Sequence, residues 1–279
     1  MTLSEQSKAL ACAVRAARAA GDLMRRNLFA VKKINATSAH DIKLELDVRC
    51  QKLIERALHK SYPRIALLGE EGVAGDPRSP QRWVVDPIDG TVNFAYGVPH
   101  ACVSIALQIQ NLAAEFATVV GVVFDPFCDE LWTAIRGQPA RLNGKVIHVS
   151  DRSTLGEAIV SIGFAKTTAT LNATLPYFNE LVRRVRKVRM MGAAALALTY
   201  VASGRFDAYI ERGIRLWDIA AGGLIIECAG GEFWREPVPG FHKYRMLASN
   251  GRLRKKLEGF GYDGIGPIST PPQRVGRSR

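Results

Sequence analysis

Three groups of acidic residues follow apolar stretches of this sequence, and their oxygen atoms could bind a divalent cation. The groups are Gly69-Glu70-Glu71, Asp86-Pro87-Ile88-Asp89-Gly90 and Trp217-Asp218. Carboxylates placed together repel one another unless positive charge compensates them, and a metal ion is the usual compensation. Oxygen ligands without thiolates or imidazoles favour Mg²⁺, Mn²⁺ or Ca²⁺ over zinc or copper. The residue types therefore predict a site for a hard cation, provided that the fold brings the three groups together.

The segment from Asp86 to Thr91 could hold both a metal ion and a phosphate group. The proline after Asp86 restricts that residue to extended backbone and favours a turn, so that Asp86 and Asp89 can face one point. The carbonyl oxygen of Ile88 can join them. Gly90 and Thr91 would then place backbone N–H groups at the start of the following segment, where a phosphate finds donors and a favourable dipole.

Each acidic group also has an ordinary structural interpretation. Pro, Asp and Gly favour surface turns for local reasons, and an acid at a helix start, such as Asp218, commonly caps the helix. The combination favours the metal interpretation, because an apolar strand leads into the turn at Asp86 and two further acids, Glu70 and Asp218, stand in comparable places. Asp218 can serve as both cap and ligand.

The apolar pattern predicts the elements that must position these acids. Thr2 and Glu5 form a capping box before a helical stripe at 10–28, and a second helical stripe at 46–58 ends at Tyr62-Pro63. Strands are expected at 65–68, 83–85, 102–109, 116–124, 130–135, 159–162 and 206–211. Helices are expected at 175–188 and 193–203, and another opens at Trp217. Alternating strands and helices predict a layered arrangement of sheets and helices.

Composition indicates a globular protein. Of the 279 residues, 47% are hydrophobic and 23% are charged, and no apolar run reaches the roughly 20 residues that span a bilayer. The Arg- and Ala-rich N-terminus resembles a transit peptide superficially, but its capping box favours a folded helix. Five cysteines, odd in number and without a C-x-x-C pair, favour reduced thiols in the cytoplasm. The histidines have no zinc-site spacing.

The formal net charge of +12 is concentrated in three places. These are the first helix, the run from Arg183 to Arg189, and the tail from Arg252 onward. Such charge could attract nucleic acid or an anionic substrate, although a solvated helix face explains it equally well. Composition alone favours the solvated surface.

Longer stretches around the acids resemble a known family. Trp83 to Phe94 resembles the metal-binding signature of the inositol monophosphatases, and Trp217 to Gly222, followed by Ala229-Gly230-Gly231, is similar to the family's second signature. Gly69-Glu70-Glu71 matches its first acidic motif. Order and spacing agree, and the similarity extends from the first helix to about Tyr262. The resemblance implies an α+β fold, a layered αβαβα sandwich of the type shared with fructose-1,6-bisphosphatase, assembled as a homodimer.

We expect one phosphatase domain over 1–265, with a metal-site half at about 1–150 and a substrate-side half at about 151–265. Residues 266–279 are expected to form a disordered basic tail. The resemblance implies two or three Mg²⁺ ions, replaceable by Mn²⁺, and inhibition by Li⁺. One ion would lower the pKa of a bound water while another neutralises charge on the leaving oxygen, so that no covalent enzyme intermediate is needed.

The resemblance also implies residue roles. Metal ligands would be Glu70, Asp86, the Ile88 carbonyl, Asp89 and Asp218. Glu70 and Thr91 would orient the attacking water, with Asp47 supporting Thr91, and Gly90 and Thr91 would hold the phosphate. Substrate contacts would fall at Ala194, Glu211 and Asp218.

Some positions depart from the family pattern. Lys43-Leu44 stand where the family often has Val-Thr after the acid that matches Asp41, and Ala36 replaces a frequent lysine. These changes concern the third metal ion and its waters. Cys228 replaces a common glutamate and is interpreted as a packing substitution near a helix end. The three main ligand motifs are intact.

Two alternatives stay open at this stage. Relatives of the same fold cleave 3'-phosphoadenosine phosphates, fructose 1,6-bisphosphate or histidinol phosphate with similar metal ligands, although Thr91-Val92-Asn93-Phe94 favours the inositol type. In a different class of function, the basic clusters could give weak contact with nucleic acid or the transcription machinery. The run from Arg183 to Arg189 lacks interleaved aromatic residues, so such binding would be mainly to backbone phosphates.

Overall fold

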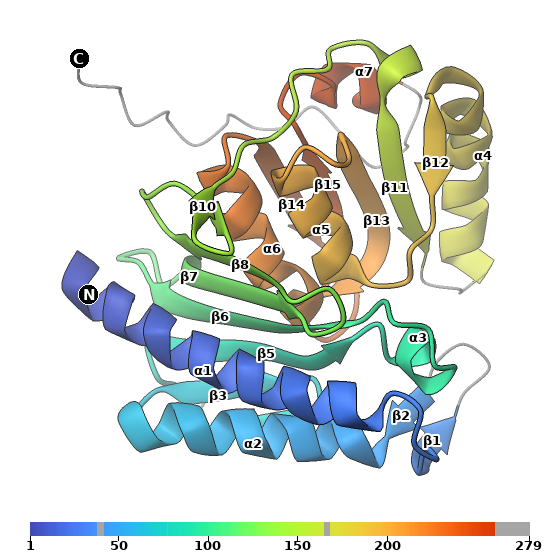
Figure 1. The fold of residues 1–279 in the computed structure, drawn as a ribbon. Coiled ribbons are helices and arrows are strands. Elements are labelled where there is room, and N and C mark those ends of the chain that lie inside the picture. The colour runs from blue at the N-terminus through green and yellow to red at the C-terminus, as the bar shows by residue number, and fades with distance from the viewer. Residues whose placement is uncertain (38–41, 77, 165–167, 260–279) are drawn as a thin grey trace.

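The computed structural model describes residues 1–37, 42–76, 78–164 and 168–259 and arranges them in alternating layers of helices and sheets (Figure 1). Helices α1 (Leu3–Asn27) and α2 (Glu45–Ser61) cover one face of a large sheet. Helices α5 (Ala194–Ala202) and α6 (Leu216–Cys228) lie between this sheet and a second one. Helices α4 (Thr168–Arg184) and α7 (Arg254–Glu258) lie on the outer side of the second sheet. The expected αβαβα sandwich is confirmed.

The two N-terminal helices form as their apolar stripes predict. The capping box is present, because the Thr2 hydroxyl accepts from Glu5 N and the Glu5 carboxylate accepts from Thr2 N at 2.7 Å. The buried face of α1 consists mainly of alanines, which lets the helix backbone approach both α2 and the sheet. Between the two helices, β1 (Ile34–Thr37) and β2 (Ile42–Leu44) form a small antiparallel pair.

The first sheet has eight strands in the order β10-β9-β8-β7-β6-β5-β3-β4. Their bounds are β3 (Ala66–Gly69), β4 (Gly72–Ala74), β5 (Gln81–Asp89), β6 (Cys102–Gln110), β7 (Phe116–Asp125), β8 (Glu130–Ile135), β9 (Arg141–Leu142) and β10 (Lys145–Val146). Strands β3 and β5 are parallel, and all other neighbours are antiparallel. Strand β5 is longer than the predicted 83–85, because its pairing with β6 resumes after a register shift between Asp86 and Asp89.

The second sheet has five strands in the order β12-β11-β13-β15-β14. Their bounds are β11 (Ile159–Phe164), β12 (Lys187–Arg189), β13 (Ala208–Arg215), β14 (Glu232–Pro237) and β15 (Lys243–Ser249), and a 3₁₀ turn, η1 (Leu155–Glu157), precedes β11. Strand β11 is parallel to β12 and β13, whereas β15 is antiparallel to β13 and β14. The strand predicted at 206–211 corresponds to β13, which lies at Ala208–Arg215.

The helix predicted at 175–188 was wrong at both ends. Helix α4 starts at Thr168 and contains Pro176 in its interior. It stops at Arg184 because Lys187 N donates to Ala158 O at 3.3 Å, which directs the chain into β12. The helix predicted at 193–203 is confirmed as α5, and the one opening at Trp217 is confirmed as α6. The expected tail at 266–279 lies outside the described residues.

The apolar core lies between the layers of helices and sheets. One cluster packs α1 and α2 against the sheet around Trp83 and Phe124, and another packs α5 and α6 between the two sheets around Trp132 and Leu198. Helix α6 is apolar around almost its whole circumference, as expected of a helix enclosed by sheets on both sides. Among the described residues, no helix is long and apolar enough to cross a membrane.

Candidate active site

The fold brings the three predicted acidic groups to one place. Glu70 follows β3, Asp86 and Asp89 lie at the end of β5, and Asp218 lies in the first turn of α6. Because β3 and β5 run parallel side by side, their ends meet at one edge of the sheet, where Glu70 N donates to Val85 O at 3.1 Å. The apolar strands that stop at acids in the sequence thus position those acids together.

Asp86 and Asp218 are buried acids of this site that contact each other. Asp86 is only 2% exposed, and its side chain is hydrogen-bonded to Asp218. Burial raises the pKa of Asp86 well above its usual range, and the nearby charges of Glu70, Asp89 and Asp218 raise it further. Burial and its acidic neighbours likewise raise the pKa of Asp218. Two carboxyl groups this close share a proton when nothing else compensates their charge.

Local hydrogen bonds fix the direction of both acids. Asp86 Oδ1 accepts from Ile88 N at 3.0 Å, which is the turn that the proline was expected to favour. Asp218 Oδ2 accepts from Arg215 N at 3.0 Å, across the first turn of α6. Asp218 is therefore a helix-capping residue and also faces the acidic site, as the sequence allowed.

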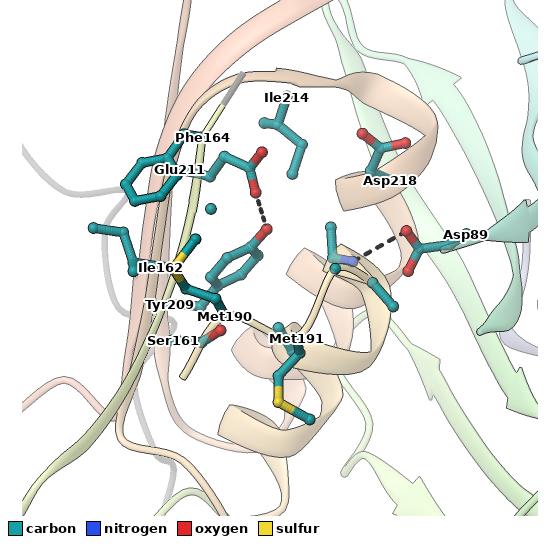
Figure 2. Close-up of a pocket in the computed structure, with 15 residues that line it drawn as sticks. Asp89, Ser161, Ile162, Phe164, Met190, Met191, Tyr209, Glu211, Ile214 and Asp218 are labelled. Atoms are coloured by element: carbon teal, nitrogen blue, oxygen red, sulfur yellow. Dashed lines mark hydrogen bonds between the residues drawn. The ribbon is translucent and has the colours of Figure 1, made fainter. Parts of the chain in front are cut away.

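Asp89 connects the end of β5 to the first turn of α5. Its Oδ1 accepts from Ala194 N at 3.0 Å (Figure 2). Its Oδ2 accepts from Ala195 N at 2.7 Å, so the carboxylate lies against the first turn of α5. Burial raises the pKa of Asp89 to about 6, although these backbone donors and the Cys102 thiol oppose the shift. The predicted substrate residue Ala194 thus lies in the site, with its N–H bound to Asp89.

The segment after Asp89 turns sharply into a short helix. Gly90 has φ +92°, and a Cβ atom there would lie 2.9 Å from His100 O and 3.1 Å from the Ala193 Cβ atom, so this position requires glycine. Thr91 begins α3 (Thr91–Ala95), and its hydroxyl donates to Ile88 O at 2.9 Å. The phosphate-binding role of Gly90 and Thr91 stays a prediction.

Asp47 lies in the first turn of α2. It is 3% exposed, and its Oδ2 accepts from Leu44 N at 2.8 Å in the first turn of the helix. Its support of Thr91 stays a prediction. Ala36 and Lys43, two positions that depart from the family pattern, pair across β1 and β2, whereas Asp41 lies outside the described residues.

A pocket of about 330 Å³ adjoins Asp89 and Asp218 (Figure 2). Its apolar wall includes Ile162, Phe164, Met190, Met191 and Ile214. Glu211 is its third acid, and the Tyr209 hydroxyl donates to Glu211 Oε2. Burial raises the pKa of Glu211 to about 7, and the Tyr209 hydrogen bond opposes the shift. The predicted substrate residue Glu211 therefore lies in a cavity beside the acidic site.

Sequence reasoning missed several residues of this site. Tyr209 and the methionines of the pocket have no motif, although Tyr209 precedes Glu211 by two positions and must share its strand face. Asn93 lies in the stretch Thr91-Val92-Asn93-Phe94, where the sequence indicates no particular function for it. Its Nδ2 donates to His100 O at 2.9 Å and to Met191 O at 2.8 Å, which ties α3 to the pocket wall.

The donor set fits Mg²⁺. Four carboxylates and the Ile88 carbonyl are hard oxygen ligands, and the raised pKa values of Asp86, Asp89 and Asp218 reflect buried negative charge that a cation would relieve. In the described part of the chain, no three Asp, Glu, His or Cys side chains already form a group that could hold an ion.

The layered fold and its acidic site define a class, the αβαβα phosphatases. A profile described as the inositol monophosphatase family matches residues 5–253. The chain therefore belongs to the inositol monophosphatase family, a family of phosphoric monoester hydrolases.

Named relatives support this membership. The chain is 41% identical over 227 residues to "Nus factor SuhB" of Pseudomonas aeruginosa, covering 78% of this chain and 82% of the relative. It is 40% identical over 227 residues to "Inositol monophosphatase 2" of Solanum lycopersicum, covering 78% and 84%. Among solved structures, the SuhB protein of Bartonella henselae superposes with a TM-score of 0.83 at 34% identity, covering 91% of this chain and 98% of that chain.

Proposed function

We propose that this protein hydrolyses a small phosphate monoester with the help of Mg²⁺. The observation that carries the proposal is the convergence of four acids, Glu70, Asp86, Asp89 and Asp218, from three separate elements beside a pocket. A buried group of like charges costs free energy in the absence of a ligand, and such sites are characteristic of function. Membership of the family supports the same reaction class.

Glu70, Asp86, the Ile88 carbonyl, Asp89 and Asp218 would hold the ions. When bound, Mg²⁺, or Mn²⁺ in its place, supplies the Lewis-acid charge that activates a water and stabilises the leaving oxygen.

The chain's own groups would do the positioning. Glu70 and the Thr91 hydroxyl orient the attacking water, and the N–H groups of Gly90 and Thr91 hold the phosphate at the start of α3. Because Asp89 is fixed to the first turn of α5, its carboxylate is already oriented before the substrate enters. Glu211 accepts a hydrogen bond from a substrate hydroxyl in the pocket.

We propose myo-inositol monophosphate as the substrate. Glu211 suits a hydroxyl-bearing leaving group, because a carboxylate accepts hydrogen bonds from hydroxyls and repels a second phosphate. The apolar wall suits the carbon face of a ring. Relatives named inositol monophosphatase support this assignment. The alternatives within the fold are 3'(2')-phosphoadenosine phosphate, histidinol phosphate and fructose 1,6-bisphosphate.

The test is phosphate release from these four substrates with Mg²⁺, with EDTA and with added Li⁺. We expect the inositol ester to have the highest kcat/KM, no turnover in EDTA, and inhibition by Li⁺. A preference for the adenosine compound would overturn the substrate but leave the reaction class standing. No turnover of any ester with Mg²⁺ present would contradict the proposed function.

A second candidate is a cytoplasmic role as a homodimeric partner of RNA or of the transcription machinery. It is favoured by relatives named "Nus factor SuhB" and by the net charge of +12. This role is tested by measuring the binding of a labelled RNA at roughly 50 to 200 mM salt, the range over which contacts with backbone phosphates weaken strongly. A variant in which Arg183 and Arg186 are replaced by acidic residues should lose RNA binding, whereas the Asp89→Asn variant should keep it. Equal binding by the charge-reversed protein would count against this role.

A further inference from the structure

Three arginines gather away from the acidic site, on the β14 side of the seam between the two sheets. Arg82 lies near the start of β5, Arg136 follows β8, and Arg235 lies in β14. A cavity of about 110 Å³ lies there, lined by residues of β7, α6 and β14. Its lining includes Phe116, Thr118, Arg136, Leu224, Glu227 and Arg235.

Aromatic rings hold two of the guanidinium groups in place. The Arg82 guanidinium carbon lies 3.7 Å from the centre of the Phe116 ring, and Arg82 Nε donates to Gln108 Oε1 at 3.0 Å. The Arg235 guanidinium carbon lies 4.9 Å from the centre of the Tyr244 ring. Neither arginine forms an ion pair with any carboxylate that the structure describes. The two side chains are therefore oriented by stacking and keep N–H donors for another partner.

Among the described residues that line this cavity, Glu227 is the only acid, and it is already paired. Glu227 Oε2 accepts from an Nη atom of Arg136 at 2.9 Å. Burial lowers the pKa of Arg235, and burial together with the charge of Arg235 lowers the pKa of Arg82. The seam thus contains more cationic than anionic groups, and the charge of Glu227 offsets only part of the hydration that Arg235 loses on burial.

We propose that this seam is a binding site for a tetrahedral oxyanion, either inorganic phosphate or the phosphate group of a small ligand. Arginine is suited to this task, because its planar fork donates two parallel hydrogen bonds to phosphate oxygens. Arg82 from the first sheet and Arg235 from the second can bind the anion from two sides. The site is separate from the acidic centre, since Arg82 precedes Asp86 by four positions, about 13 Å along the strand.

The site is tested by titrating inorganic phosphate into the protein by calorimetry in EDTA, against NaCl of equal ionic strength. EDTA removes metal ions, so that phosphate binding through the acidic centre does not contribute. We expect one saturable site in the unmodified protein. Arg235→Gln and Arg82→Gln should each weaken it at least tenfold. Arg56→Gln, an exposed arginine of α2, makes the same charge change elsewhere and should bind within twofold of the unmodified protein.

Glu227→Gln provides a test in the opposite direction. It removes the competing carboxylate while keeping the side-chain size, so it should tighten phosphate binding several-fold even if an arginine variant folds poorly. A phosphomonoester, glycerol 2-phosphate, distinguishes the two sources: comparable affinity indicates the phosphate group of a ligand, and much weaker affinity indicates the free anion. Absence of saturable binding, unchanged binding in both arginine variants, or equal weakening by Arg56→Gln would overturn the proposal.

Discussion

The Asp89 carboxylate accepts a hydrogen bond from the backbone N–H of Ala195 at 2.7 Å, across 106 positions of the chain. The bond connects the end of β5, in the first sheet, to the first turn of α5, which lies between the two sheets. Because a helix N-terminus favours negative charge, this contact keeps Asp89 ionised more readily than its burial alone would allow. The Asp89 carboxylate thus connects β5 to α5 and also belongs to the proposed metal site.

Asp89→Asn is expected to lower kcat/KM for the preferred ester at least a hundredfold. The variant keeps the side-chain shape but loses one anionic oxygen needed to hold a cation. Asp218→Asn should have a similar effect, whereas Glu211→Gln should cost much less, because Glu211 touches only the leaving group. Phosphate release with saturating Mg²⁺ measures all three. Asp151→Asn, at an exposed position, is the matched control and should leave the rate unchanged.

Mg²⁺ itself should raise the unfolding temperature of the protein, because a ligand that binds only the folded state stabilises it by mass action. Thermal unfolding in EDTA and at increasing Mg²⁺ measures the shift without any turnover. At about 100 times the dissociation constant, the gain is about 2.7 kcal/mol. Asp86→Asn should abolish most of the shift. An equal shift in this variant would mean that the ion binds elsewhere.

Tyr209→Phe is expected to raise KM about fivefold with little change in kcat. The variant removes the hydroxyl that donates to Glu211, a contribution of about 1 kcal/mol for an ordinary hydrogen bond. Glu211 then loses a fixed orientation in the pocket but stays away from the reacting phosphate. Initial rates over a range of inositol phosphate concentrations separate the two constants. A loss of kcat with an unchanged KM would contradict a role in substrate positioning.

Glu211 should make the metal-free protein less stable as the pH rises. Its pKa is about 7 in the folded protein against 4.5 for an ordinary glutamate, so the folded state binds the extra proton between these values. The stabilising effect of that proton is largest below about pH 4.5 and is lost as the pH rises through 7. The unfolding temperature of the unmodified protein relative to Glu211→Gln should therefore fall from pH 5 to pH 8. A constant difference would contradict the shifted pKa.

Gly90→Ala should destabilise the protein and reduce its activity. The left-handed backbone costs about 1 kcal/mol for a residue with a Cβ atom, and the clash with His100 O adds to this. Gly137→Ala is the matched control, since Gly137 has φ +81° but no atom within 4 Å of its would-be Cβ. Chemical denaturation of both variants gives the loss in the free energy of unfolding and so separates backbone strain from the steric clash. Equal losses in this free energy would show that the clash contributes nothing.

The sequence by itself determined the local features of this protein. The capping box of α1, the apolar strands at 102–109, 116–124 and 130–135, and the acids that end β3 and β5 follow from short-range patterns of apolar, turn-forming and acidic residues. Glu70 and the segment from Asp86 to Asp89 lie at a common edge because β3 and β5 are adjacent parallel strands, and the sequence marks the ends of both strands with acids. The resemblance to a family extended this to the layered fold.

Tertiary structure alone decided which distant groups meet. The ends of α4 depend on where the chain pairs with β11, and no local pattern marks that point. Strands β14 and β15 were not predicted, since their apolar residues alternate too weakly to stand out. The contact of Asp89 with α5 and the meeting of Arg82 with Arg235 join residues more than a hundred positions apart. Such pairs are fixed by the packing of whole layers, which acts through the buried surface of many residues rather than through any spacing along the chain.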